Sequence, residues 1–336
     1  MLLAHAGRPD HSPWVWHAHP DVVAVSAVLV VGYYLAFTRL GPRLTPPGSL
    51  VVTRRQLVWL GLAIGGFWVM SEWPVHDLSE GYLYSVHMVQ HLVYTLILPP
   101  MFIWGTPRWL WRWLLRPILP AFRLLTRPLL ALLLFNAVIA ASHWTALVSA
   151  AVRSGPMHLG QHAVLVATAF LMWWPVLSPL AELPRLVPPL QMGYLFLQSL
   201  VPTVPASFLT MAEGPIYRIY GECPRTLGLS VVADQQIAGA IMKIGGAAIL
   251  WAGIVVVFFR WFAEEDRRPS TRPRPATAST RTATASTTTC VPASVSRIAR
   301  AARRRAATAR PSTLSRQPSR LGVRVATAKS PSRLTK

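Results

Sequence analysis

Seven long apolar segments constrain the fold of this chain more than any other feature of its sequence. Each is close to the ~20 mostly apolar residues that a helix needs to cross a bilayer, and none alternates as barrel strands do. They are residues 21–38, 56–73, 82–104, 128–148, 157–178, 189–211 and 235–262. Pro202 and Pro205 predict a kink in the sixth. The sequence therefore predicts an all-α, polytopic membrane bundle of about seven transmembrane helices.

The composition excludes an ordinary soluble enzyme, and the charge distribution argues against a nucleic-acid binder. Of the 336 residues, 52% are hydrophobic and 13% are charged, whereas soluble domains carry about 25% charged residues. The net charge is +21, but residues 263–336 hold 17 Lys or Arg against three acidic residues. After Pro269 this tail lacks Phe, Trp and Tyr. It is predicted to be disordered, with its charge attracted to membrane lipids.

Arginines in the short loops predict the orientation, because the membrane side richer in Lys and Arg is cytoplasmic. Ten loop arginines fall on one side and four on the other. The ten are Arg39, Arg43, Arg54, Arg55, Arg108, Arg112, Arg116, Arg123, Arg127 and Arg185, and the four are Arg8, Arg153, Arg218 and Arg225. The predicted domains are an outer segment (1–20), a seven-span domain (21–262) and a cytoplasmic tail (263–336). Residues 107–127 interleave Arg with Trp and Leu and are predicted to lie in the inner interface.

All ten histidines fall on the predicted outer side, and four of them form two H-x-x-x-H pairs, His87/His91 and His158/His162. Residues four apart share one face of a helix, so each pair presents two imidazoles to one point. His143 reaches a similar depth. Ionisable residues inside a membrane are costly and mark functional sites, and imidazole is a ligand for Cu, Zn, Fe and Ni. The sequence predicts a metal site here.

Four further residues are candidates for the same site. Met88 and Met242 could supply thioethers, which favour Cu(I). His76 lies in the outer loop, as a weaker candidate. Asp234 begins the seventh span, where it could cap that helix, act as a ligand, or accept a hydrogen bond from a metal-bound imidazole.

At these residues the sequence resembles the bacterial CtaG-type cytochrome c oxidase assembly factors. The similar stretches are 73–107 (with W-P-V-H-D and H-M-V-Q-H), 158–162 (H-L-G-Q-H), 173–176 (W-W-P-V) and 234–243 (D-Q-Q-I-A-G-A-I-M-K). The resemblance implies a multi-pass protein of the bacterial plasma membrane that delivers copper, on the outer face, to a haem–copper oxidase subunit. The residues it carries over are His87, Met88, His91, His158, His162 and Asp234. Gln161 departs from the family pattern, in which this position is often acidic.

We therefore expect a metallochaperone-like assembly factor that holds copper, as Cu(I), and is not an enzyme. The alternative is a membrane oxidoreductase that uses the same histidines for haem or a di-iron centre. A haem needs two axial histidines on opposite sides of its ring, whereas each i, i+4 pair lies on one face. Di-iron membrane enzymes resemble a pattern of adjacent histidines on the cytoplasmic side, which this chain lacks.

Overall fold

The computed structural model describes residues 14–16, 18–221 and 227–267. These residues form helices and connecting loops, with no strand among them. The predicted all-α class is thus confirmed for the described part of the chain. The tail that is predicted to be disordered lies outside the described residues, and so do His5, His11 and His17.

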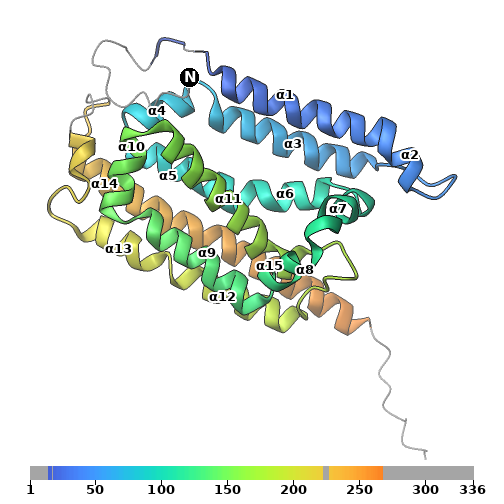
Figure 1. Cartoon of the computed structure of the whole chain (residues 1–336). Coiled ribbons are helices and arrows are strands. Elements are labelled where there is room, and N and C mark those ends of the chain that lie inside the picture. Colours follow the sequence, from blue (N-terminus) through green and yellow to red (C-terminus); the bar gives the residue numbers. More distant parts are fainter. Residues whose placement is uncertain (1–13, 17, 222–226, 268–336) are drawn as a thin grey trace, which may run out of the picture. The chain divides into compact units, whose positions relative to one another are not determined.

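The first half of the bundle runs from α1 to α8 (Figure 1). Helix α1 (Pro20–Leu35) runs through a π-helical turn (Ala36–Leu40) into α2 (Gly41–Leu44), and α3 (Arg54–Ser71) returns beside it. Then follow α4 (Val75–Gly81), α5 (Tyr84–Leu92), a π-helical turn (Val93–Ile97), α6 (Leu98–Gly105), α7 (Arg108–Leu115), a 3-10 turn (Arg116–Ile118) and α8 (Leu119–Leu125).

The second half of the bundle completes the core. Its elements are α9 (Pro128–Ser142), α10 (Thr145–Arg153), α11 (Gly155–Leu177), α12 (Pro188–Leu200), α13 (Thr203–Met211), a 3-10 turn η4 (Arg218–Gly221), α14 (Val231–Ala240), a π-helical turn (Ile241–Gly245) and α15 (Gly246–Asp266). The break between α12 and α13 lies at Pro202, where the sequence predicted a kink. Helix α15 continues four residues into the segment assigned to the tail.

Five helical segments of the described chain are long and apolar enough to cross a membrane, two fewer than predicted. They are Pro20–Leu44, Tyr84–Gly105, Gly155–Leu177, Pro188–Met211 and Val231–Asp266. A sixth candidate joins Arg108–Leu125 to Pro128–Ser142 across an 87° bend. The predicted spans at 56–73 and 128–148 do not qualify by themselves. Helix α3 begins with two arginines and a glutamine, and α9 has only 15 residues before the chain turns at His143.

Helix α11 packs against α9 and α6, while α3 packs on α6, α12 on α15, and α13 on α14. Its residues Leu165 and Met172 are fully buried. Close packing also depends on Gly239, where an added Cβ would lie 2.8 Å from the Ala206 carbonyl oxygen on α13. A larger side chain there would force α13 and α14 apart.

The bundle has two chemically different ends (Figure 1). Helices α4 and α10 and the first turns of α5 and α11 lie at one end, which we call the histidine end. Helices α2, α7 and α8, the loop 178–187 and the last turns of α15 lie at the other, which we call the basic end because the loop arginines gather there.

Candidate metal centre

Two helices bring the predicted histidine pairs face to face at the histidine end. His87 and His91 lie on α5, and His158 and His162 lie in the first two turns of α11. The ring centres are 4.2 Å apart within each pair, and the rings of His91 and His162 are 4.8 Å apart across the two helices. As the i, i+4 spacing predicts, two imidazoles from each helix point toward the same place. We call these four residues the imidazole cluster.

The Nε2 atom of His162 lies at the middle of this cluster. It is 2.9 Å from Nε2 of His91 and 3.0 Å from Nε2 of His158. A ring nitrogen of a neutral imidazole has either one proton or one lone pair, so it cannot satisfy both neighbours by hydrogen bonding. A cation can accept a lone pair from each of several imidazoles at once.

The spacing of the nitrogens is close to that of a metal site. Ligand nitrogens of His87, His158 and His162 lie within 4.8 Å of one another. Metal–imidazole bonds of about 2.0–2.1 Å place the nitrogens of a tetrahedral site about 3.3 Å apart. The 2.9 and 3.0 Å contacts at His162 are a few tenths of an ångström shorter than that. A small outward movement of the rings would seat an ion.

His143, at the end of α9, faces the same cavity from a third element. Its Nδ1 lies 2.8 Å from the carbonyl oxygen of Ile139. Because a carbonyl only accepts, Nδ1 carries the proton and Nε2 keeps its lone pair. Among the described residues this Nε2 is buried without a hydrogen-bond partner. Fixing the tautomer through the other ring nitrogen is typical of metal-binding imidazoles.

The cavity itself is small and is lined by both polar and apolar side chains. It has a volume of about 30 Å³ and is lined by His87, Met88, His91, His143 and His158 together with Ser79, Tyr84, Ser142, Val148, Ala151, Val152, Gln161 and Tyr220. Met88 is buried, as a soft ligand in this position would be. The lining residues include no carboxylate, so the cavity offers imidazole and thioether groups rather than negative charge.

Asp234 positions α5. Its two carboxylate oxygens accept hydrogen bonds from the backbone amides of Tyr84 (2.7 Å) and Ser85 (3.1 Å), about 150 residues away in sequence. A carboxylate at a helix N-terminus satisfies free amides and favours the helix dipole. The alternative that Asp234 caps its own helix is wrong, because Ser230 caps α14. Asp234 therefore acts on the helix that carries His87 and His91.

Two other predicted residues lie apart from the cluster. His76 packs its ring edge-on against His19, with ring centres 4.7 Å apart, and His19 forms an ion pair of 2.8 Å with Asp77. Met242 is buried against a separate cavity that Lys243 also lines. Neither residue is among those that line the imidazole cavity. The structure thus groups His87, Met88, His91, His143, His158 and His162, and leaves His76 and Met242 elsewhere.

Sequence reasoning missed the aromatic wall of the cavity. The ring of Tyr84 stacks on His87 at 6.1 Å, and Tyr217 and Tyr220 pack against Tyr84 at 5.2 and 5.0 Å. The Tyr217 hydroxyl also donates to the backbone carbonyl of His143. Tyr84 was within reach of prediction, since it precedes His87 by three residues and shares its face. Tyr217 directly precedes the short 3-10 turn η4 and Tyr220 lies in it. The sequence has no periodic pattern that predicts this turn.

Together, the bundle and its cluster define a polytopic helical membrane protein with an imidazole-rich cavity near one end. Residues 31–264 match the family described as cytochrome c oxidase caa3 assembly factor (Caa3_CtaG). The chain belongs to this family, and the match includes every residue of the imidazole cluster.

Two curated relatives are similar to this chain over most of its length. The uncharacterized proteins Mb0105 of Mycobacterium bovis and MT0111 of Mycobacterium tuberculosis are each 25% identical to this chain over 292 residues, which is 77% of the chain and 41% of each relative. The chain thus spans less than half the length of these relatives. No solved structure matches it.

Proposed function

We propose that this protein accepts copper, as Cu(I), at the imidazole cluster and passes it to the copper-containing oxidase that its family serves. The observation that carries the proposal is that ligand nitrogens of His87, His158 and His162 lie within 4.8 Å of one another, with Nε2 of His91 2.9 Å from Nε2 of His162. The copper is cargo rather than a resident cofactor, and the role is not catalytic.

The donor set favours Cu(I) over other metals. Imidazole and thioether ligands suit copper, whereas carboxylate and carbonyl oxygens suit Mg²⁺ and Ca²⁺. The cavity is lined by histidines and Met88 with no carboxylate among the lining residues. Since this donor set is neutral, a monovalent ion leaves less uncompensated charge in a low-dielectric site than a divalent one.

The position of the cluster suits exchange. His158 lies in the first turn of α11, four residues after the N-cap residue Ser154, and is only half-buried. A partner subunit approaching this end could reach His158 first and draw the ion from it. We propose that this end faces the outside of a bacterial plasma membrane and the basic end the cytoplasm, in line with the positive-inside rule.

The cluster geometry supports a single ion better than a haem. Two axial nitrogens bound to one iron are about 4 Å apart, at about 2.0 Å each. The closest pair across α5 and α11 is 2.9 Å apart, which leaves no room for a porphyrin between the rings.

A copper titration of the purified full-length protein tests the proposal. Cu(I) affinity is measured in detergent by competition with a colorimetric chelator, and metal content by mass spectrometry. We expect His158→Gln with His162→Gln to weaken binding at least about 100-fold. The matched control, His76→Gln, removes an imidazole outside the cavity and should retain wild-type affinity.

Helix content and gel-filtration profile establish that the double variant is folded. Unchanged Cu(I) affinity in a folded double variant would refute the copper proposal. A Soret absorption band in the purified protein would support haem, and two bound iron ions per chain would support a di-iron centre. In cells, the double variant should lower the copper content of the oxidase.

A further inference from the structure

A second and much larger cavity lies at the basic end of the bundle. It has a volume of about 630 Å³ and is bounded by α3, α6, α11, α12 and α15. Helices α3 and α6 pack together on one side, and α12 and α15 on the other. The cavity separates these two pairs and shares no lining residue with the imidazole cavity.

The walls of this cavity are hydrocarbon and aromatic. Four tryptophans line it: Trp59, Trp104, Trp173 and Trp261. The indole N–H of Trp173 donates to the Thr95 carbonyl, so its ring is fixed with the polar atom satisfied. Two lining residues, Trp104 and Val256, are 44% and 55% exposed, so the cavity is open to the surrounding bilayer. Its occupant must therefore present mainly apolar surface.

The length of the cavity matches one leaflet. Along α15 its lining residues run from Ile249 to Glu264, and the part up to Arg260, where a head group would begin, is about 17 Å long at 1.5 Å per residue. The hydrocarbon core of a bilayer is about 30 Å thick, so the cavity is about as long as one acyl chain layer. A lipid acyl chain is the apolar group of this length that a membrane contains.

Two arginine side chains lie at the end of the cavity where a lipid head group would bind. Arg185 and Arg260 both line it and are exposed, and neither forms an ion pair with another residue of the described chain. Glu264, one turn beyond Arg260, also lines the cavity. Two positive charges thus face one negative charge, which favours an anionic head group over a zwitterionic one. Arginine binds phosphate oxygens in bidentate geometry.

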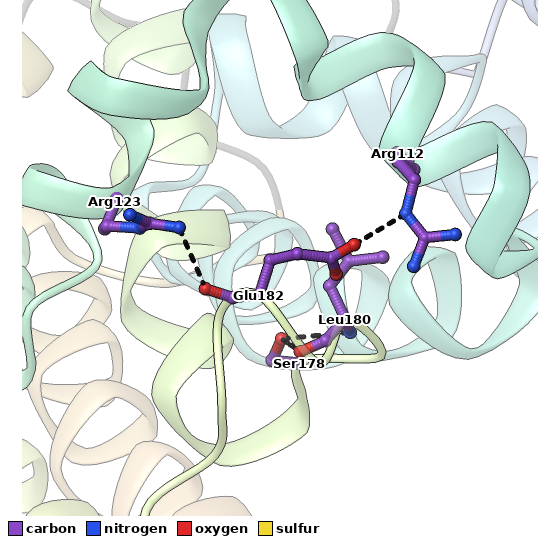
Figure 2. A network of polar contacts seen from close by, with 5 residues as sticks. All are labelled: Arg112, Arg123, Ser178, Leu180 and Glu182. Atoms are coloured by element: carbon purple, nitrogen blue, oxygen red, sulfur yellow. Dashed lines mark hydrogen bonds and ion pairs between the residues drawn. The ribbon is translucent and has the colours of Figure 1, made fainter.

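The loop that carries Arg185 is held in place by polar contacts (Figure 2). Arg112 on α7 donates to the Glu182 carboxylate at 2.8 Å, and Arg123 on α8 donates to the Glu182 backbone carbonyl at 3.4 Å. On the other side of Arg185, the Leu186 amide donates to the carbonyl of Pro175 at 2.8 Å. Arg185 is therefore presented by an ordered loop, which lowers the entropy cost of binding a phosphate.

We propose that this cavity is a specific site for an anionic phospholipid, with the phosphate at Arg185 and Arg260 and an acyl chain between α6 and α15. By the positive-inside rule it belongs to the cytoplasmic leaflet. The bound lipid fills the space between the two helix pairs. The site is independent of copper binding, since it lies at the other end of the bundle.

Native mass spectrometry of the delipidated full-length protein tests this site with phosphatidylglycerol and phosphatidylcholine of identical acyl chains. We expect the wild type to bind phosphatidylglycerol at least about tenfold more tightly. Arg185→Gln with Arg260→Gln should remove this preference. Arg39→Gln with Arg43→Gln, which removes two exposed arginines of the same end that do not line the cavity, should keep it.

Two further variants separate the head-group site from the acyl-chain site. Ala252→Phe fills the cavity and should weaken both lipids equally, while Glu264→Gln should tighten phosphatidylglycerol binding a few-fold. Circular dichroism and gel filtration establish that each variant is folded. Equal binding of the two lipids by the wild type would overturn the proposal, as would loss of the preference in the Arg39/Arg43 control. A co-purifying transmembrane peptide in the cavity would assign it to a protein partner instead.

Discussion

The two ends of the bundle differ in the size, polarity and origin of their cavities. At the histidine end the cavity is about 30 Å³, and its imidazoles come from α5, α11 and the end of α9. At the basic end the cavity is about 630 Å³, with apolar walls and two arginines at its mouth. A small cavity with converging lone pairs selects an ion, whereas a long apolar one selects a hydrocarbon chain. The same bundle therefore contains two cavities of different chemistry, one at each end.

Removing the central imidazole should have the largest effect on the histidine end. We expect His162→Gln to weaken Cu(I) binding about 100-fold, because His162 contacts both His91 and His158. His143→Gln should lower the Cu(I) affinity about tenfold, since His143 approaches from a third element. His76→Gln should leave the Cu(I) affinity unchanged. Chelator competition on the purified variants measures the series. Equal losses at His162 and His76 would mean that the cluster is not the binding site.

Removing the Asp234 carboxylate, which caps α5, should destabilise the helix that carries His87 and His91. Asp234→Ala leaves the buried amides of Tyr84 and Ser85 without their acceptor, which should lower the free energy of unfolding by about 2–3 kcal/mol. Ser230→Ala, the matched loss of a cap on α14, should cost about 1 kcal/mol. Denaturant titration followed by circular dichroism compares the two. A smaller loss at Asp234 than at Ser230 would contradict this role.

The sequence predicted the histidine end better than the basic end, and the reason is local geometry. An i, i+4 pair fixes a shared helix face without knowledge of the neighbours, so His87/His91 and His158/His162 were predicted correctly as pairs that meet. The hydrogen bonds that Asp234 accepts from the start of α5 were not predicted, because its partners lie about 150 residues away. His76 follows Pro74 and lies on α4, a short helix that places it beside His19.

The apolar segments of the sequence predicted the fold class, but they did not predict where the helices bend or fall short of a membrane span. Apolar length locates a helix but says nothing of the 87° bend before α9, or of the polar start that leaves α3 below the hydropathy of a spanning helix. The basic-end cavity was also beyond prediction. It arises where α6 and α15 lie apart. The residue types that line it also occur between closely packed helices, so the sequence does not distinguish the two cases.

The ion pair that pins the Arg185 loop gives a smaller, pH-dependent effect. The hydrogen bond from Arg112, with the guanidinium charge beside it, holds the pKa of Glu182 below its usual value of 4.5. Its contribution to stability is therefore present above pH 4.5 and is lost as the pH falls through the lowered pKa. Glu182→Gln should remove this dependence and weaken phosphatidylglycerol preference about twofold. Thermal unfolding of both proteins between pH 3 and 7 checks it; parallel curves would show that the pair does not hold the loop.

The smallest expected effect is the most informative about the comparison itself. If the two cavities are separate sites, Arg185→Gln with Arg260→Gln should leave Cu(I) affinity within about twofold of wild type, and His162→Gln should leave the lipid preference intact. The physical reason is that additivity holds for distant sites without shared partners, and no residue lines both cavities. Titrating copper in nanodiscs with and without phosphatidylglycerol measures the coupling directly. A tenfold change in either direction would mean that α5–α6 or α11, which contribute to both cavities, carry a conformational change from one membrane surface to the other.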